Sequence, residues 1–337
     1  MTSIDASAPV AVIGAGSFGT AVSWMLRQSG YEVNLWCYDP DDARAINETA
    51  HNPSFLSDCD LAGVRATSVV AEAVKNCQSV IIVTPSFAVV DAALGIADVI
   101  SSETPVVILS KGIDLSGGKL LLDAVVEEIG NRDRVAVLSG PNHAEELSRG
   151  AYAGATVACS NESVAEYFQN LISNDFFRVY VSNDPVGVSL CGASKNVIAI
   201  ACGITRGAGF GDNAVSVLIT RGLAEIVRLA EACGGKLSTC MGLAGVGDLN
   251  ATCNSLHSRN GMYGEAFARE GVSVEDYEKR RHMVVEGAHA LEPLLRLGHE
   301  KGVELPIMEM VKKLLNKDVT IEEAAAGLMG RELTKER

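Results

Sequence analysis

Two patterns of hydrophobic and polar residues divide the chain near residue 184. Before that point, short apolar runs alternate with segments of helical periodicity. The apolar runs predict strands at Val10–Ile13, Glu32–Trp36, Ser79–Val83, Pro105–Leu109, Arg134–Leu138, Ala155–Cys159 and Arg178–Val181. The periodic segments predict helices at Phe18–Ser29, Phe87–Ile100, Lys119–Ile129 and Ser163–Ile172. Continuous apolar strands that alternate with helices are typical of a parallel sheet covered on both faces.

After residue 184 the strand pattern stops and only helical periodicity remains. Helices are predicted at Val186–Ala201, Asn213–Cys233, Ser258–Glu270, Gly287–Lys301, Ile307–Asn316 and Ile321–Leu328. Glycine and proline separate several of these segments, as at Gly234-Gly235, Gly302 and Pro306. The sequence therefore predicts an α/β protein with a doubly wound, mainly parallel sheet in residues 1–183 and an all-helical domain in residues 184–337.

A glycine-rich turn joins the first predicted strand to the first predicted helix, with the spacing G-x-G-x-x-G. Gly14 allows the tight turn, Gly16 lets a pyrophosphate approach the backbone, and Gly19 permits close packing of the helix. The start of that helix offers unpaired N–H groups to the phosphates. The turn predicts a Rossmann-type dinucleotide site that includes Gly14, Gly16, Ser17, Phe18 and Gly19.

The sequence leaves the choice of dinucleotide open. Asp39 stands twenty residues after Gly19 at the end of the second predicted strand, where an acid binds the ribose 2′-hydroxyl of NAD. However, Pro40 can turn that carboxylate away, and Arg44 lies one helical turn further on, where it can meet a 2′-phosphate. Both NAD(H) and NADP(H) are therefore expected cofactors.

One lysine interrupts a long apolar segment. Between Val186 and Thr205 the only charged residue is Lys195, and its helical neighbours are Cys191, Gly192, Ile198 and Ala199. A lysine on an apolar face is costly unless it reaches water or finds a partner. It is either a helix-edge lysine that reaches solvent or a base in a partly dehydrated pocket. In the second case, burial and a nearby cation lower its pKa towards neutrality.

Polar residues follow two neighbouring strands and recur later in glycine-rich turns. Ser110-Lys111-Gly112 and Ser139-Gly140-Pro141-Asn142 each follow a predicted strand, at the edge where open α/β sheets bind ligands. Gly247-Asp248 and Ser258-Arg259-Asn260 lie in the helical part. Each segment alone is typical of a turn or a capped helix. Together they supply cations, amides and hydroxyls that suit a phosphate.

Charge limits the range of partners. The chain has 28 Lys and Arg against 42 Asp and Glu, a formal net charge of −14. A nucleic-acid surface needs a basic stripe, so nucleic acid is not an expected partner. A small anionic substrate is compatible with this balance because a local cationic pocket can override the global field.

Cysteine and histidine spacing, the N-terminus and hydropathy favour a cytoplasmic protein. The nine Cys contain no C-x-x-C pair and are expected to be reduced thiols. The six His show no metal-binding spacing, so no metal is expected. Met1–Pro9 lacks the features of a signal peptide. No apolar run is expected to reach the roughly 18 residues of a membrane span.

Eight ordered motifs carry a resemblance to one family. They are GAGSFGTA from Gly14, SKG from Ser110, SGPNHAEE from Ser139, GASKNVIAI from Gly192, NAVSVLITRGLAE from Asn213, GLAGVGDL from Gly242, TCNSLHSRN from Thr252 and VVEG from Val284. From Val10 to about Arg331, the chain resembles bacterial-type NAD(P)-dependent glycerol-3-phosphate dehydrogenase. The resemblance implies interconversion of sn-glycerol 3-phosphate and dihydroxyacetone phosphate, a supply of backbone for phospholipids, and a homodimer.

The resemblance also implies roles for particular residues. Lys195 corresponds to the proton acceptor. The substrate positions are Lys111, Gly140, Asn142, Lys195, Asn196, Asp248, Ser258, Arg259 and Asn260. The cofactor positions, beyond the three glycines, are Ser17, Phe18, Tyr38, Lys111, Ala144, Arg259, Val284 and Glu286. Two departures stand out: Asn142-His143 replaces a more usual Thr-Phe pair, and Tyr38 stands where some relatives carry His.

These positions give a mechanistic hypothesis. Arg259 and Asn260 hold the substrate phosphate, and Lys195 exchanges the proton of the C2 hydroxyl. Asp248 orients Lys195 or a substrate hydroxyl, and Lys111 adds positive field that lowers the pKa of Lys195. Two other readings remain: a 3-hydroxyacid or ketopantoate reductase of the same layout, which has no reason to carry Arg259, and a sensor that binds NAD(H) without chemistry.

Overall fold

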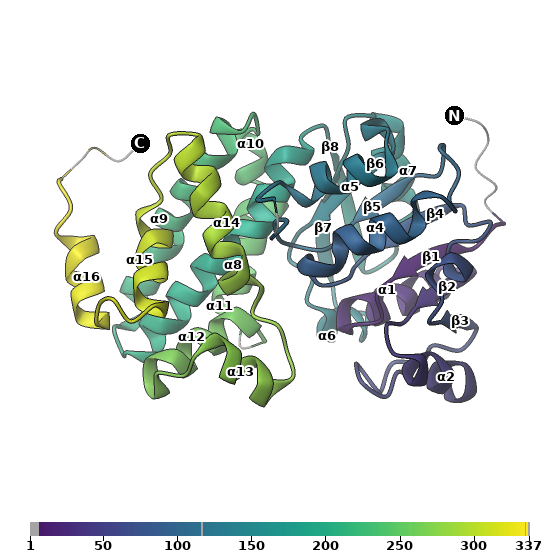
Figure 1. Ribbon diagram of the computed structural model, residues 1–337, viewed down its shortest axis with the longest axis horizontal. Coiled ribbons are helices and arrows are strands. Elements are labelled where there is room, and N and C mark those ends of the chain that lie inside the picture. Colours follow the sequence, from purple (N-terminus) through teal and green to yellow (C-terminus); the bar gives the residue numbers. More distant parts are fainter. Residues whose placement is uncertain (1–6, 116, 256, 334, 336–337) are drawn as a thin grey trace.

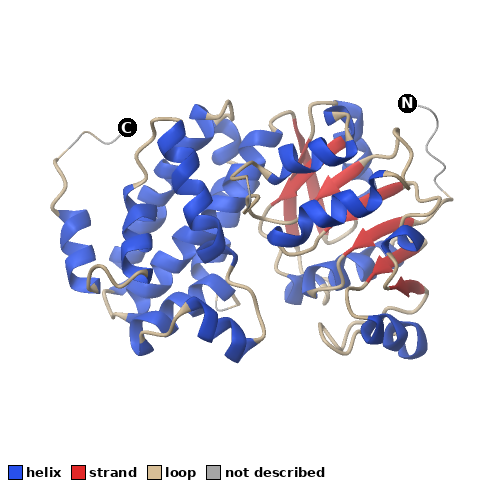
Figure 2. Cartoon of the chain, in the orientation of Figure 1, coloured by secondary structure: helices blue, strands red, loops and turns tan. Residues whose placement is uncertain are grey.

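The computed structural model describes residues 7–115, 117–255, 257–333 and 335. Most of the N-terminal segment considered above for a leader, residues 1–6, lies outside this part of the chain. Figure 1 shows two halves side by side, and Figure 2 shows that the strands are confined to the N-terminal half. The C-terminal half is built from helices, so the predicted fold class is confirmed.

One eight-stranded sheet forms the centre of the N-terminal half. Its strands are β1 (Val10–Ile13), β2 (Val33–Trp36), β3 (Val64–Thr67), β4 (Ser79–Ile82), β5 (Val106–Ile108), β6 (Val135–Ser139), β7 (Ala153–Ala158) and β8 (Phe177–Ser182). They lie in the order β3-β2-β1-β4-β5-β6-β7-β8. Neighbours are parallel except β6 and β7. The order reverses between β1 and β4, the position at which open α/β sheets bind ligands.

Helices cover both faces of this sheet. They are α1 (Ser17–Gln28), α2 (Pro40–Thr49), α3 (Val70–Ala73), α4 (Val89–Ala97), α5 (Leu121–Ile129), α6 (Ala144–Leu147) and α7 (Glu162–Ile172), with 3₁₀ turns η1 (Ser86–Ala88) and η2 (Arg132–Arg134). Side chains alternate along each strand. Ala11 and Ile13 therefore join the core under α4 and α5, whereas Val10 and Val12 join the core under α1 and α7.

The C-terminal half surrounds one long buried helix. Its elements are α8 (Pro185–Gly207), α9 (Gly211–Ala232), α10 (Leu237–Cys240), the π-helical turn η3 (Leu243–Gly247), α11 (Asp248–Asn254), α12 (Arg259–Glu270), α13 (Val274–Arg281), α14 (Glu286–Glu300), α15 (Pro306–Leu315) and α16 (Ile321–Met329). Helix α8 packs against α9, α11, α12 and α14 (Figure 1). The buried Asp184 caps its start by accepting the Gly187 N–H at 2.8 Å.

The expectation that no apolar run reaches the length of a membrane span is wrong for α8. Residues Pro185–Gly207 are long and apolar enough to cross a membrane, but 94% of the apolar window is buried inside the protein. Many of its residues are small, such as Gly192, Ala193 and Gly203, and they let neighbouring helices approach closely. Among the described residues it is the one helix that meets this criterion, and it forms the core of the helical half.

All seven predicted strands are present, but β3 was not predicted. It is only four residues long and lies at the edge of the sheet, with Arg65 exposed. Such an edge strand carries little of the apolar signal that marks a buried one. The helices missed by the prediction are short or polar: α2, α3, α6, α10, α11 and α13.

A buried carboxylate holds the start of α15. Glu225 on α9 is 2% exposed and accepts hydrogen bonds from the N–H groups of Ile307 at 2.6 Å and Met308 at 3.3 Å. These N–H groups belong to the first turn of the helix and have no intrahelical partner. Burial nevertheless raises the pKa of Glu225 from 4.5 to about 7, although the two backbone hydrogen bonds oppose this shift.

This raised pKa makes stability depend on pH. Between pH 4.5 and about 7 the folded protein binds the Glu225 proton more tightly than the unfolded chain does. The contribution of Glu225 to the free energy of unfolding is therefore expected to fall by about 3 kcal/mol as the pH rises through this window. Urea unfolding at pH 5 and pH 8 should show this fall in the wild type and not in Glu225→Gln. An equal pH dependence in both proteins would contradict the assignment.

Candidate active site

The predicted site residues of the sheet and of the helical half meet at one place. Lys111 follows β5 and Asn142 follows β6, so both leave the carboxyl edge of the sheet. Lys195 lies on α8, and Asp248 begins α11. Gly192, one turn before Lys195, lies against Ser139 and Lys111, and an added Cβ there would stand 3.1 Å from the Ser139 Oγ. Helix α8 therefore sits directly against the two strand ends.

The Asp248 carboxylate links the two halves. It is 1% exposed, and its Oδ2 accepts hydrogen bonds from the Lys111 Nζ at 2.9 Å and the Ser139 Oγ at 3.0 Å. Its Oδ1 accepts one from the Lys195 Nζ. Lys195 also donates to the Thr252 Oγ1 at 2.7 Å. One carboxylate thus holds two ammonium groups, which leaves the cluster with net positive charge when both lysines are protonated.

Lys111 is fixed by three acceptors. Besides Asp248, its Nζ donates to the Gly140 carbonyl at 2.9 Å and to the Asn142 Oδ1 at 2.8 Å. Gly140 must lack a side chain, because an added Cβ would stand 2.5 Å from the Ala155 Cα. The loop after β6 can therefore approach β7 closely. In this position the Gly140 carbonyl and the side-chain amide oxygen of Asn142 both face the Lys111 Nζ.

The cluster gives Lys195 a pKa near neutrality. Burial lowers it from 10.5 to about 7; the Asp248 carboxylate opposes this shift and the Lys111 ammonium adds to it. Burial alone would raise the pKa of Asp248, but the two lysines together hold it below its ordinary value. Lys195 can therefore gain and lose a proton at pH 7 while Asp248 stays ionised. The helix-edge reading of Lys195 is wrong, since the residue is 5% exposed.

A second group of predicted residues is formed by Asn196, which follows Lys195 on α8, and Asn260 on α12. The Asn260 Nδ2 donates to the Asn196 Oδ1 at 3.1 Å, and the Asn260 Oδ1 accepts the Gly287 N–H at 2.9 Å. Gly287 packs on the backbone of Asn196, where an added Cβ would come within 2.5 Å of its carbonyl oxygen. The side chains of Asn196 and Asn260 therefore bind each other and join α8, α12 and α14.

Glu286 reaches from α14 to the sheet. Its carboxylate accepts hydrogen bonds from the Ser86 N–H at 3.1 Å and from the Ser86 hydroxyl. Gly112, next to Lys111, lies against the same pair, and an added Cβ would be 2.5 Å from the Ser86 Cβ. The contact between the two halves is therefore continuous. It runs from the loop of Lys111 through Ser86 and Glu286 to the backbone of Asn196.

The glycine-rich turn has the shape that a pyrophosphate needs. Gly14 has a φ of +121°, in the region that favours glycine. An added Cβ on Gly19 would stand 1.8 Å from the Gly14 carbonyl oxygen, whereas one on Gly16 would meet no atom within 4 Å. No side chain caps the start of α1, so its first N–H groups remain available to a ligand. The turn and the start of α1 therefore fit the pyrophosphate of a dinucleotide, and they contain the predicted residues Gly14, Gly16, Ser17, Phe18 and Gly19.

The remaining predicted residues lie outside the hydrogen-bonded cluster around Asp248. Arg259 is the first residue of α12; it is exposed and makes no ion pair with any described residue. Ser258 caps that helix by accepting the Gly261 N–H at 3.2 Å. Ala144 begins α6, and Val284 precedes α14. Tyr38 is 88% exposed beyond the end of β2, apart from the lysine cluster.

Four residues of the site were assigned no role from the sequence. Thr252 lies one helical turn after Asp248, and that spacing could have found it. Ser139 precedes Gly140 and was noted only as part of a turn. Ser86 is 200 residues from Glu286, so nothing local signals their contact. Burial lowers the pKa of His143, and the charges of Lys195 and Lys111 add to that effect.

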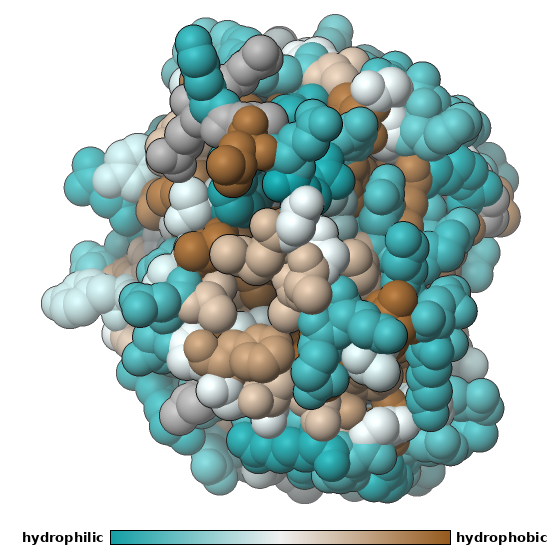
Figure 3. Space-filling view, turned by 90° about the vertical axis from the view of Figure 1, so that its left-hand side faces the viewer, coloured by the Kyte–Doolittle hydropathy of each residue, from teal (hydrophilic) through white to brown (hydrophobic). Residues whose placement is uncertain are grey.

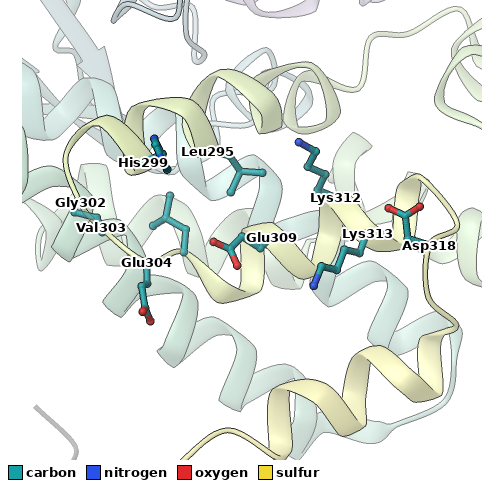
Figure 4. A pocket seen from close by; sticks show the side chains of 10 residues that line it. Leu295, His299, Gly302, Val303, Glu304, Glu309, Lys312, Lys313 and Asp318 are labelled. Carbon is teal, nitrogen blue, oxygen red and sulfur yellow. The ribbon is translucent and has the colours of Figure 1, made fainter.

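Of two hollows in the described part of the protein, one is lined by neighbours of a site residue and the other lies away from the site. One of about 560 Å³ is lined by the residues on either side of Asn142, by α6, by the start of β7 and by the end of α11: Pro141, His143, Glu146, Tyr152, Ala153, Gly154, Ala251 and Ser255. The other, of about 550 Å³, lies between α14 and α15 and shares no residue with the site (Figure 4). There Lys312 pairs with Glu292 at 2.6 Å and Glu304 with Arg331 at 2.9 Å, so those charges are already matched.

A dehydrogenase that acts on an alcohol needs a bound nicotinamide and a group that exchanges protons near neutral pH. The dinucleotide turn and Lys195 provide for both, and they define the chain as an NAD(P)-dependent oxidoreductase. Family models for the N-terminus and the C-terminus of NAD-dependent glycerol-3-phosphate dehydrogenase match residues 9–165 and 184–326. The chain belongs to this family.

Relatives support that membership over the full length. The glycerol-3-phosphate dehydrogenase [NAD(P)+] of Moorella thermoacetica is 41% identical over 97% of this chain and 97% of its own. That of Parvibaculum lavamentivorans is 39% identical over 97% and 98%. The crystal structure of glycerol-3-phosphate dehydrogenase from Coxiella burnetii has a TM-score of 0.91 at 32% identity, covering 96% of this chain and 99% of that one.

A ketopantoate reductase, which was one of the alternatives, and a D-mandelate dehydrogenase share the fold at low sequence identity. A ketopantoate reductase structure from Ralstonia eutropha has a TM-score of 0.56 at 18% identity, covering 92% of this chain and 99% of that one. A D-mandelate dehydrogenase structure has a TM-score of 0.61 at 16% identity, covering 92% and 97%. These likenesses concern the fold alone. The reductase alternative therefore gains no support beyond the shared architecture.

Proposed function

We propose that the protein interconverts sn-glycerol 3-phosphate and dihydroxyacetone phosphate with NAD(H) or NADP(H), and so supplies glycerol 3-phosphate for phospholipid synthesis. The observation that carries this proposal is Lys195, a buried lysine with a pKa of about 7 held against Asp248 at the carboxyl edge of a dinucleotide-binding sheet. When bound, the nicotinamide supplies or accepts the hydride at C2 of the substrate.

Lys195 moves the proton in this scheme. During reduction its ammonium gives a proton to the C2 oxygen, and during oxidation its neutral amine takes the proton back. Asp248 and Thr252 hold the Nζ in place at the cluster. Burial, with a further contribution from the Lys111 charge, keeps the pKa of Lys195 low, so that the neutral amine is available at pH 7. Asn142 stands beside the reacting group, and its Nδ2 has no hydrogen-bond partner among the described residues, so this N–H group is suited to bind a substrate hydroxyl.

The start of α12 is suited to the substrate phosphate. Arg259 is exposed and unpaired among the described residues, so its guanidinium is available to form a bidentate contact. The Asn260 side chain is occupied by Asn196 and Gly287, so its contribution is the backbone N–H in the first helical turn. Ser258 fixes this turn through its cap.

Purified protein should reduce dihydroxyacetone phosphate and consume NADH or NADPH, as followed by absorbance at the nicotinamide band. Ketopantoate and 3-oxoacids should not be reduced at comparable rates. A folded protein that binds a dinucleotide but turns over none of a panel of phosphorylated ketones would instead support a sensor without chemistry.

Arg259→Lys separates phosphate recognition from proton transfer. This change keeps the charge but loses the planar fork, so kcat/KM for dihydroxyacetone phosphate is expected to fall by about 10- to 100-fold, chiefly through KM. The rate with unphosphorylated dihydroxyacetone should change much less, since that substrate lacks the phosphate. Steady-state kinetics with both substrates make the comparison. Equal losses for the two would point to a role of Arg259 at the cofactor instead.

We also propose the organisation of the molecule in the cell. Residues 1–183 form the dinucleotide-binding domain and residues 184–337 the substrate domain, in a cytoplasmic protein with no membrane span. A homodimer is supported by apolar residues that gather in the middle of the C-terminal end (Figure 3). Val217 on α9 and Met329 on α16 are 54% and 80% exposed. Light scattering coupled to gel filtration tests the dimer, and a monomer at micromolar concentration would refute it.

A further inference from the structure

Arg206, in the last turn of α8, contacts two of the helices that carry the proposed site. Its Nη2 donates a hydrogen bond to the carbonyl of Cys253 at the end of α11. Its Nε pairs with the Glu265 carboxylate on α12 at 3.4 Å. An added Cβ on Gly261, in the first turn of α12, would stand 3.7 Å from the Arg206 Nη2. One side chain therefore joins the end of α11 to the start of α12.

The contacts of Arg206 lie on either side of the short connection that leads to Arg259. This connection runs from α11 to α12, and within it the Ser258 N–H donates to the Ser255 carbonyl at 3.2 Å. The Cys253 carbonyl belongs to the last turn of α11, where carbonyls lack intrahelical partners and a cation is favourable. Arg206 therefore holds both ends of the connection, and with them the point at which the Arg259 side chain leaves α12.

The two arginines differ in how far their charges are already used. The Nη2 and Nε of Arg206 are both engaged, its charge is offset by Glu265, and its side chain is 28% exposed. Arg259 is exposed and makes no ion pair with any described residue. A phosphate is therefore better served by the guanidinium of Arg259, whereas that of Arg206 is built into the protein.

We propose that Arg206 is a positioning residue for the substrate phosphate, which holds the connection between α11 and α12 so that Arg259 reaches the site. This inference rests on the function proposed above. Helix α12 does not depend on Arg206 for its place, because it packs tightly on α8: an added Cβ on Gly203 would come within 2.2 Å of the Gly261 carbonyl oxygen. Loss of Arg206 is therefore expected to loosen the connection while α12 and Lys195 stay in position.

Steady-state kinetics of Arg206→Ala with two substrates test this role. KM for dihydroxyacetone phosphate is expected to rise by about 10-fold, whereas kcat/KM for dihydroxyacetone, which lacks the phosphate, should change by less than about twofold. Arg206→Lys keeps the charge, but one ammonium does not reproduce the fork that binds Cys253 and Glu265, so this variant should resemble Arg206→Ala. Arg269→Ala is the matched control. It removes the other, exposed partner of Glu265 and should behave as the wild type with both substrates.

A double mutant tests whether Arg206 acts through Arg259. In Arg259→Ala the phosphate contact is already lost, so adding Arg206→Ala should raise KM for dihydroxyacetone phosphate by less than about twofold more. A full further loss in that background would overturn the positioning role. So would equal losses with the two substrates, wild-type kinetics in Arg206→Lys, or an Arg269→Ala variant as impaired as Arg206→Ala. These outcomes leave the proposed function intact, whereas a folded wild type that does not turn over dihydroxyacetone phosphate would overturn that function itself.

Discussion

Lys195→Ala is expected to slow both directions of the reaction by a factor on the order of 10²–10⁴, the usual loss when a positioned general acid–base is removed. Phosphorylated and unphosphorylated substrates should lose alike, because both need the same proton transfer. Stopped assays at high enzyme concentration are needed to measure the residual rate. The Kd for NADH should stay near its wild-type value, which shows that the variant is folded.

Lys195→Arg tests whether the proton or only the charge matters. Arginine keeps a cation beside Asp248, but its guanidinium does not lose a proton in proteins. This variant should therefore be about as inactive as Lys195→Ala. Lys279→Ala, on the exposed side of α13, is the control and should retain full activity. Substantial activity in Lys195→Arg would mean that Lys195 acts as a fixed charge and that another group carries the proton.

The pKa of Lys195 also sets the pH dependence of the wild type. Oxidation needs the neutral amine, so its kcat/KM should rise with pH and level off above about 7. Reduction needs the ammonium, so its kcat/KM should fall as the pH rises above about 7. An unperturbed lysine would place both changes near 10.5 instead.

Much of the sheet could be predicted because its strands are buried on both faces. The apolar runs of β1, β4, β5 and β6 stand out for this reason. The antiparallel pairing of β7 could not be read from the sequence, since strand direction depends on where the chain returns and not on local hydropathy. Edge strand β3 and polar helix α2 gave too weak an apolar pattern to be predicted.

The hydropathy pattern alone could identify Lys195, whereas the groups that control it were proposed only through the family resemblance. A single charge in an apolar helix is a local signal, and it marks both burial and a shifted pKa. The partner Asp248 lies 53 residues away, and Lys111 is 137 residues from Asp248. Only the packing of α8 and α11 against the carboxyl edge of the sheet brings them together. The motif resemblance pointed to these residues, whereas the distances between them required the fold.

The contact between the two halves could not be predicted from the local sequence either. Glu286 was expected at the cofactor, and the structure adds that its carboxylate binds Ser86 at the sheet. Neither residue stands in a pattern that predicts the other. Asn196 and Asn260 were both predicted at the substrate site, and the structure adds that their side chains bind each other. Their amides join α8 to α12 and α14, and the proposed mechanism therefore assigns the substrate phosphate to Arg259 and to backbone groups.

Asp248→Asn is expected to lower kcat/KM in both directions by at least 100-fold and to destabilise the protein. The change keeps the shape of the side chain and one oxygen for Ser139, but it leaves Lys111 and Lys195 together without a counter-charge. Removing one partner of a buried ion pair typically costs about 3–5 kcal/mol. Urea unfolding at pH 7 measures that loss. Because the pKa of Asp248 in the folded protein lies below its ordinary value of 3.8, the loss should shrink only as the pH falls below 3.8 towards that lower pKa, where the wild-type carboxylate is protonated.

The pH profile of Asp248→Asn separates the proposed role of Asp248 from simple damage to the fold. Asp248 raises the pKa of Lys195, so without it the inflection for oxidation should move from about 7 to a lower pH. The plateau should also be lower, because an amine of lower pKa is a weaker base. Ser139→Ala removes a hydrogen bond to the same carboxylate but no charge, and it should leave the inflection in place. If Asp248→Asn loses activity with the inflection still near 7, Asp248 does not act through Lys195 and contacts the substrate instead.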